Sequence, residues 1–265
     1  MTRTFGWSLA VAIALASSVT TARGQTPAGV VLRSGATEIN LNGRVQAQFN
    51  TTDADGEPAT QWELRRVRLE ATVRVNDLVS GKVQPEFAGS RVSLRDAWVR
   101  LSFDPGLLVT AGQMHRQFGV ITPTSALRIL PIERGVRIRG VGEALDYWNL
   151  VSGLGYADRD VGIQLSGEPA GAPLGLAYAL GYFNGPARDA AGGESTDQLV
   201  ARLSVRPLPK LRIGAGWSGR HFVTDTLPGG EADEVGRGHA WGADVEWGEY
   251  GPGLHLVGEV ATGDL

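Results

Sequence analysis

The segment TEINLNGRVQAQFN, residues 37–50, alternates apolar and polar side chains along its length. Ile39, Leu41 and Val45 fall on one side of the alternation, while Asn40 and Arg44 fall on the other. A period of two is what a β-strand imposes, because successive side chains point to opposite faces of a sheet. The segment therefore predicts an amphipathic strand.

The following segment, WELRRVRLEATVRVN at residues 62–76, repeats this pattern. Trp62 and Leu64 lie out of phase with the apolar positions that begin at Val67. Such a change of phase predicts a β-bulge near Arg65 or an early turn.

The alternation continues, with one long interruption, to the end of the chain. Further strands are expected at residues 78–87, 92–103, 107–118, 160–167, 174–185, 197–207, 211–222, 239–250 and 254–261. Turns are expected at residues 53–58, 76–77, 104–106, 170–173 and 208–210, where Gly, Pro, Asn or Asp gather. About eleven long strands favour an all-β, transmembrane antiparallel β-barrel, because the soluble alternative, a β-sandwich, uses strands of about 5 to 6 residues.

The composition restricts the alternatives. The 265 residues include 37 glycines and no cysteine, which excludes disulfides and cysteine-based metal or nucleophile chemistry. No linker divides the chain, and no later segment offers the roughly 20 apolar residues of a spanning helix, so any membrane crossing must use strands. Residues 25–140 carry 15 Lys/Arg against 11 Asp/Glu, and residues 141–265 carry 8 against 17. The basic groups therefore gather before and within residues 117–158. The alternative explanation is that solvated surfaces differ in charge by chance.

The first 24 residues differ from the rest. Arg3 supplies a positive start, residues 5–16 are apolar, and Ala22-Arg23-Gly24 places small residues before a cleavage at Gln25. We expect a signal peptide at residues 1–24, a polar lead at 25–36 and a barrel domain at 37–265. The alternative is a transmembrane anchor, for which the apolar run is short.

The polar faces of the expected strands carry many cations. In a membrane barrel these faces line a water-filled lumen. The predicted pore-lining or anion-binding wall residues are Arg66, Arg68, Arg74, Lys82 and Arg100, and Arg44 lies on the same polar face. The alternative for each is a structural role in a network with Glu70, Glu86 or Asp96.

The long interruption, residues 117–158, follows the fifth expected strand. It is too long for an ordinary loop of a compact domain, so we expect it to be functional and folded inward. Its predicted anion-binding residues are Arg128, Arg134, Arg137 and Arg139, preceded by Arg116 at the end of the strand. Four acids, Glu133, Glu143, Asp146 and Asp158, balance them in number. We expect residues 128–139 to face the lumen and residues 143–158 to lie against the wall or outside.

Five segments in order carry a family resemblance. They are RRVRLEATVRVND at residues 65–77, DAWVRLSFDPGLLVTAGQMHRQFGV at 96–120, LPIERG at 130–135, DRDVGIQLSGE at 158–168 and LGLAYALGYFNG at 174–185. Together they resemble the phosphate-selective porins O and P of bacterial outer membranes, over roughly residues 43–220.

The resemblance implies a homotrimeric barrel of sixteen strands, in which a long loop and wall cations form an anion-selective constriction. Residues 132–134 would be the counterpart of a Met-Glu-Arg-like piece of that loop, and Arg116 would lie where the strand enters it. Because about eleven strands are present, we expect the C-terminal strands of the family to be missing.

The predicted function is therefore passive diffusion of small anions, such as phosphate or polyphosphate, across the outer membrane of a Gram-negative bacterium. The expected partners are these anions, outer-membrane lipid and two further copies of the chain, with no nucleic acid and no cofactor. The alternatives are a weakly selective general porin and a structural or adhesive barrel without conductance.

An enzyme is not expected. His115, His221, His239 and His255 lie in unrelated contexts, and neither G-x-S-x-G nor H-E-x-x-H occurs. Asp158 and Asp160 are a weak indication of a metal site, so no catalytic or metal residue is predicted.

Overall fold

The structure is a computed structural model, and it describes residues 11–13, 29–54, 57–89, 92–124, 155–185, 194–224, 234–248 and 254–263. Within these ranges the chain forms thirteen β-strands and one short 3-10 helix, Pro173–Gly175. No helix in them is long and apolar enough to cross a bilayer. The prediction of an all-β, antiparallel chain is confirmed.

The strands belong to two compact units, Met1–Arg74 with Lys82–Arg95 and Val75–Gly81 with Asp96–Leu265. Their bounds are β1 Val11–Ile13, β2 Val30–Ser34, β3 Thr37–Ala54, β4 Glu57–Arg74, β5 Val79–Glu86, β6 Ser93–Asp104, β7 Leu107–His115, β8 Arg159–Gly167, β9 Ala177–Phe183, β10 Glu194–Leu208, β11 Leu211–Thr224, β12 Glu234–Trp247 and β13 Leu256–Gly263. The strands β3 to β13 correspond to the eleven predicted ones.

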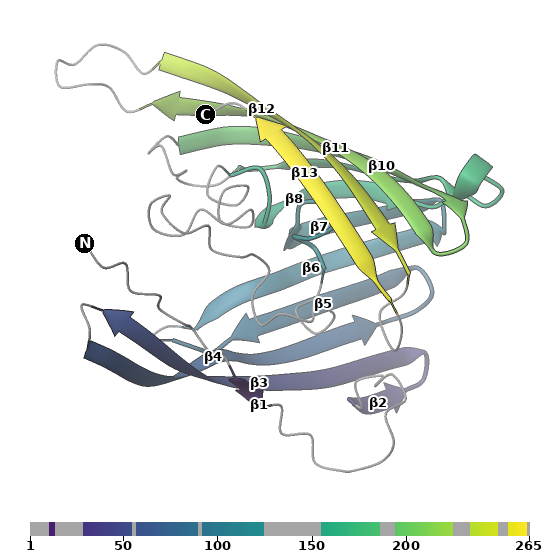
Figure 1. Cartoon of the computed structure of the whole chain (residues 1–265). Helices are drawn as coiled ribbons and strands as arrows, with labels where there is room; N and C mark the ends of the chain where they lie inside the picture. The colour runs from purple at the N-terminus through teal and green to yellow at the C-terminus, as the bar shows by residue number, and fades with distance from the viewer. Residues whose placement is uncertain are drawn as a thin grey trace. The chain divides into compact units, whose positions relative to one another are not determined.

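A long antiparallel hairpin, β3 with β4, dominates the first unit (Figure 1). Its register places Val45 opposite Val67 and Arg44 opposite Arg68, so apolar residues share one face and cations the other. Gln46 lies opposite Arg66 and the next pair joins Ala47 to Leu64, which leaves Arg65 as the extra residue of a bulge. The predicted bulge near Arg65 is confirmed.

Two features of the first unit differ from expectation. The turn predicted at residues 53–58 is shorter, because the ladder continues to the pair Ala54 and Glu57. The polar lead, for which no strand was predicted, contributes β2, whose Val30 to Ser34 pair with β3 through a turn at Gly35. Gly35 has a φ of 59°, a conformation that glycine adopts without strain.

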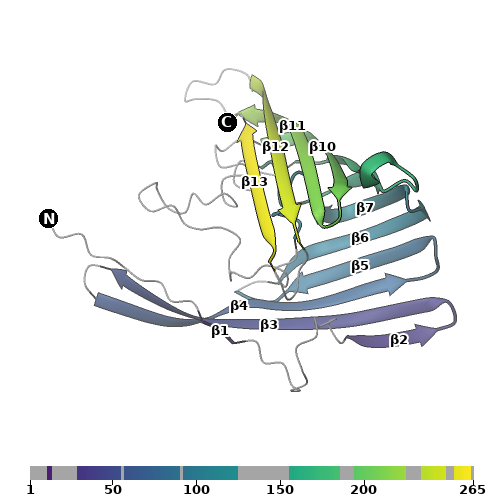
Figure 2. The same ribbon diagram turned by 45° about the vertical axis from the view of Figure 1, so that its right-hand side comes forward.

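In the second unit, β7 to β12 each pair with the next strand in the chain, and Figure 2 shows β10 to β13 side by side. The predicted turn at 104–106 is present, and the Asp104 carboxylate accepts a hydrogen bond from the Gly106 amide at 2.6 Å. The turn at 208–210 is also present, with Lys210 at a φ of 67°. Short turns and antiparallel neighbours are the expected connectivity of a barrel wall.

Several strand ends were predicted wrongly. The fifth predicted strand, 107–118, ends as β7 at His115, because Asp158, which faces Arg116, has a φ of 80° and the Phe118 amide bonds back to the Arg116 carbonyl. The strand predicted at 174–185 begins only at Ala177, after the 3-10 turn. The one predicted at 239–250 begins earlier, at Glu234, because the ladder with β11 extends into a polar segment.

The pattern of exposure is the reverse of that in a soluble protein. Large apolar side chains on the strands are exposed, among them Val45 at 64%, Leu203 at 57% and Val260 at 69%. The buried set is rich in polar groups instead, including Arg66, Gln164, Gln198, Asp244 and Glu246. Such a wall satisfies its polar groups on one side and offers its apolar side to lipid.

Candidate channel lining

A group of three arginines, Arg44, Arg66 and Arg68, occupies the polar face of β3 and β4, and we call it the basic cluster. Arg66 donates to Gln46 at 2.9 Å, and Arg68 forms an ion pair with Glu86. The Glu86 carboxylate also accepts a hydrogen bond from the Val67 amide at 2.7 Å. The cluster thus sets three guanidinium groups beside the carboxylates of Glu86 and Glu70, and Glu70 is also paired with Lys82.

Arg44 is the least satisfied member of the basic cluster. Arg44 and Arg68 are directly opposite in the register, an arrangement of like charges that costs stability. The Arg44 Nε is buried and has no hydrogen-bond partner among the described residues. An oxyanion in the lumen would supply the acceptor that this nitrogen lacks, because guanidinium groups match oxyanions in charge and geometry.

The other predicted wall residues are engaged in different ways. Lys82 forms an ion pair with Glu70 at 2.9 Å, as the structural alternative expected. Arg100 donates from Nε to the Thr110 hydroxyl at 3.0 Å and lies 4.6 Å above the Trp98 ring. Arg74 is exposed near the end of β4.

Arg116 lies at the point where β7 leaves the wall, and only 2% of its surface is exposed. Its guanidinium donates to the Gln198 side chain, to the Ala157 carbonyl and, at 3.4 Å, to Asp160. Gln198 in turn donates to the Ser218 hydroxyl at 2.7 Å. These contacts tie both ends of the long loop to β10 and β11, while an anion contact at Arg116 stays a prediction.

The four predicted loop arginines, Arg128, Arg134, Arg137 and Arg139, lie outside the described residues. The described ends of the loop are residues 116–124, which we call the loop root, and residues 155–158. In the loop root Phe118 is fully buried, and in the returning end Tyr156 and Ala157 are at most 1% exposed. These residues cluster with Met114, Phe183, Val200 and Ala240, so the two described ends of the loop pack on the polar side of the second unit.

The wall is flat where Phe118 meets it. A Cβ added to Gly216 would lie 1.9 Å from the Phe118 carbonyl oxygen, and one added to Gly242 would lie 3.2 Å from the Phe118 ring. Arg202 donates to the same carbonyl at 3.3 Å. Because these two glycines have no side chains, the loop root can pack directly against β11 and β12.

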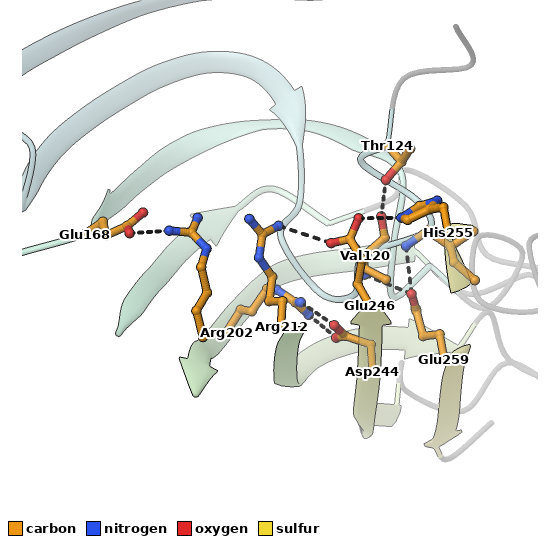
Figure 3. Close-up of polar contacts among 11 residues, drawn as sticks. Val120, Thr124, Glu168, Arg202, Arg212, Asp244, Glu246, His255 and Glu259 are labelled. Carbon is orange, nitrogen blue, oxygen red and sulfur yellow. Dashed lines mark hydrogen bonds and ion pairs between the residues drawn. The ribbon is translucent and has the colours of Figure 1, made fainter. Parts of the chain in front are cut away.

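Glu259 of β13 holds the loop root further along (Figure 3). Its carboxylate accepts hydrogen bonds from the Val120 and Ile121 amides at 2.8 and 2.7 Å. The Thr124 hydroxyl donates to the Val120 carbonyl at 2.6 Å and closes the turn. Two amides that would otherwise lack partners are thereby satisfied by one charged acceptor.

A row of ion pairs lies beside the loop root on β10 to β13 (Figure 3). Arg202 binds Asp244 through both of its terminal nitrogens, at 2.5 and 2.8 Å. Glu246 accepts from Arg212 at 3.4 Å and contacts the His255 ring at 3.1 Å. This part of the wall is balanced in charge, unlike the basic cluster.

The bidentate pair offers a test of this wall. We expect Asp244→Asn to lower the free energy of unfolding by about 3 kcal/mol, because the Asp244 side chain is 1% exposed and its loss leaves Arg202 without its charge partner. The double variant Arg202→Met/Asp244→Leu should regain most of that loss, since neither charge is then buried alone. Urea unfolding in detergent measures both, and equal stability of Asp244→Asn and the wild type would contradict the expectation.

Sequence reasoning did not select several residues of this lining. Arg159 binds Asp96 at 2.6 Å across 63 residues of chain, and Glu259 reaches Val120 of the loop root across 139. Alternation could place Arg202, Arg212 and Asp244 on a polar face, but no sequence signal marked their partners. Among the described residues, no group of three His, Cys, Asp or Glu side chains could hold a metal ion.

The fold and this lining define a class of protein. Exposed apolar residues alternate with covered charges along antiparallel strands, and a loop packs onto the polar side, which is the design of an outer-membrane pore protein. A model of the phosphate-selective porin O and P family matches residues 39–211, well over half of the chain, and the chain belongs to this family. A search of curated proteins found no match. The protein is therefore an outer-membrane porin, a member of a family of channels.

Proposed function

We propose that this porin passes small oxyanions such as phosphate, and that the basic cluster of β3 and β4 attracts them. The observation that carries the proposal is the excess of guanidinium groups over the carboxylates of Glu86 and Glu70, together with the buried Arg44 Nε, which has no acceptor among the described residues. A hydrated wall with such an excess favours anions over cations.

The test is single-channel recording of the full chain in planar bilayers, with the reversal potential in a potassium chloride gradient and a phosphate titration. We expect anion preference, and block of the chloride current by phosphate. Arg44→Gln should lower the anion-to-cation permeability ratio about twofold, because one of the three cations is lost. Arg33→Gln, which removes an equally basic side chain that is 73% exposed on β2, should leave the ratio unchanged.

Other outcomes choose between the alternatives. If the channel is anion-selective but phosphate does not block the chloride current, phosphate is excluded as the substrate and other small anions remain. The second candidate, a weakly selective general porin, is favoured by the balanced pairs of β10 to β13, and a reversal potential near zero would support it. A protein that inserts without conducting would be the structural or adhesive barrel.

The loop and the assembly add further parts to the proposal. We expect residues 128–139 to face the lumen and residues 143–158 to lie on the wall side or outside. We also expect cleavage before Gln25 and a homotrimer, as the family resemblance implies. Mass spectrometry of the mature N-terminus and cross-linking in native membranes test the last two expectations.

A further inference from the structure

The outward face of β12 changes character step by step along the strand. From the start of the strand it presents Arg237, His239, Trp241, Ala243, Val245 and Trp247, all of them exposed. Trp241 is 61% exposed and Trp247 is 43% exposed. Two tryptophans thus bracket a short apolar stretch, and the charged positions lie beyond the first of them.

The neighbouring strands repeat this order. Trp217 of β11 lies opposite Trp241, and Leu211 lies opposite Trp247. The exposed aliphatic residues Leu203, Ile213 and Val260 belong to the stretch between these rows. Six residues separate the two rows, roughly 20 Å along a strand, and at a tilt of about 40° this length covers about 15 Å of the apolar band, which is about 25 Å tall in an outer-membrane barrel. The row of Leu211 and Trp247, beside the turn between β10 and β11, therefore marks one edge of the lipid-facing band. The other edge lies about ten residues along β12, beyond Trp241 and near Arg237.

Basic groups lie beyond the Trp217 and Trp241 row, towards this second edge. The His239 ring stacks on the Trp217 ring, with centroids 5.9 Å apart and planes inclined by 24°. Arg237 lies two residues beyond His239 on the same face and opposite His221 in the register. The Asp197 carboxylate of β10 contacts the His221 ring at 2.7 Å. It is therefore engaged by His221, and it lies two strands, about 10 Å, from Arg237.

We infer that Arg237 and His239, with the Trp217 ring, form a binding site for the phosphate headgroup of an anionic lipid. The site lies at the edge of the band near the longer connection between β11 and β12, which in this class faces the cell exterior. The Arg237 fork matches a phosphate in charge and geometry, and tryptophan favours the boundary between headgroup and hydrocarbon. The acyl chains would lie on the band itself, beside Ile213 and Val245.

Native mass spectrometry of the full chain in an uncharged detergent tests the site, with phosphatidylglycerol and phosphatidylcholine as probes. This proposal rests on the outward orientation of the apolar face and not on anion selectivity. If the lipid site is absent, the proposed channel function is therefore unaffected. We expect the double variant Arg237→Gln/His239→Gln to bind phosphatidylglycerol at least about fivefold more weakly, with phosphatidylcholine binding unchanged. Arg33→Gln, an exposed arginine far along the chain, should retain wild-type binding of both lipids.

Four results would overturn the inference. Equal phosphatidylglycerol binding by the double variant and the wild type would remove the site, and loss of both lipids together with a lower melting temperature would indicate a structural role. Loss of an oligomer in the double variant, at unchanged lipid binding, would make this face a contact between copies of the chain. Inorganic phosphate at equal concentration should not displace the lipid, and displacement would indicate a simple anion site.

Discussion

Gly216→Ala is expected to raise the single-channel conductance by about twofold and to make the current unsteady. The added Cβ would meet the Phe118 carbonyl oxygen at 1.9 Å, so the loop root must move away from β11. The hydrogen bond from Arg202 to the Phe118 carbonyl is then lost as well. A loop detached at its root obstructs the lumen less and occupies more than one position. Recordings in planar bilayers measure both effects.

The matched control is Gly258→Ala on β13. The nearest atom to its added Cβ is an outward-facing Val245 methyl at 3.6 Å, an ordinary contact distance, so the conductance should not change. Glu259→Ala provides a second route to the same result, because it removes the acceptor of the Val120 and Ile121 amides without adding volume. If both loop variants conduct like the wild type, the loop root does not position the part of the loop that limits the current.

Arg116→Met is expected to lower the free energy of unfolding by about 3 to 5 kcal/mol. Arg116 is almost fully covered, and methionine leaves Gln198, Asp160 and the Ala157 carbonyl without its donors. A buried acceptor without a partner retains its full cost of desolvation. Urea unfolding of the protein in detergent, followed by circular dichroism, measures the change.

Arg33→Met is the control for that substitution. Arg33 pairs with Glu38 at an exposed position, where loss of the pair should cost less than about 1 kcal/mol. The opposite result is informative as well. A stable Arg116→Met variant that has lost its anion preference would show that Arg116 contacts the permeating ion and does not mainly hold the loop.

Much of the wall followed from periodicity. The faces of β3 and β4, the bulge at Arg65 and the turns at 104–106 and 208–210 were predicted correctly, because each depends on residues adjacent in the chain. Strand ends were less predictable, since they depend on a partner. β7 stops at His115 because Asp158 on the returning chain has a φ of 80° and the Phe118 amide bonds back to the Arg116 carbonyl, and Phe118, predicted as a strand residue, is fully buried instead.

The candidate site divides in the same way. The basic cluster could be foreseen, because Arg44, Arg66 and Arg68 fall on one face by alternation alone. The partners could not be foreseen, since Asp96 meets Arg159 and Glu259 meets Val120 only after distant strands come together. Charge balance in the lining is therefore a property of these pairings and not of the counts of basic and acidic residues.

The sequence by itself determined that this chain makes amphipathic antiparallel strands with a cation-rich polar face, because side-chain alternation is a local property of the backbone. Only the tertiary structure decided which cations remain in excess and where the long loop begins to pack. Both depend on register and on contacts between residues far apart in the chain, at Glu86, Gly216 and Glu259.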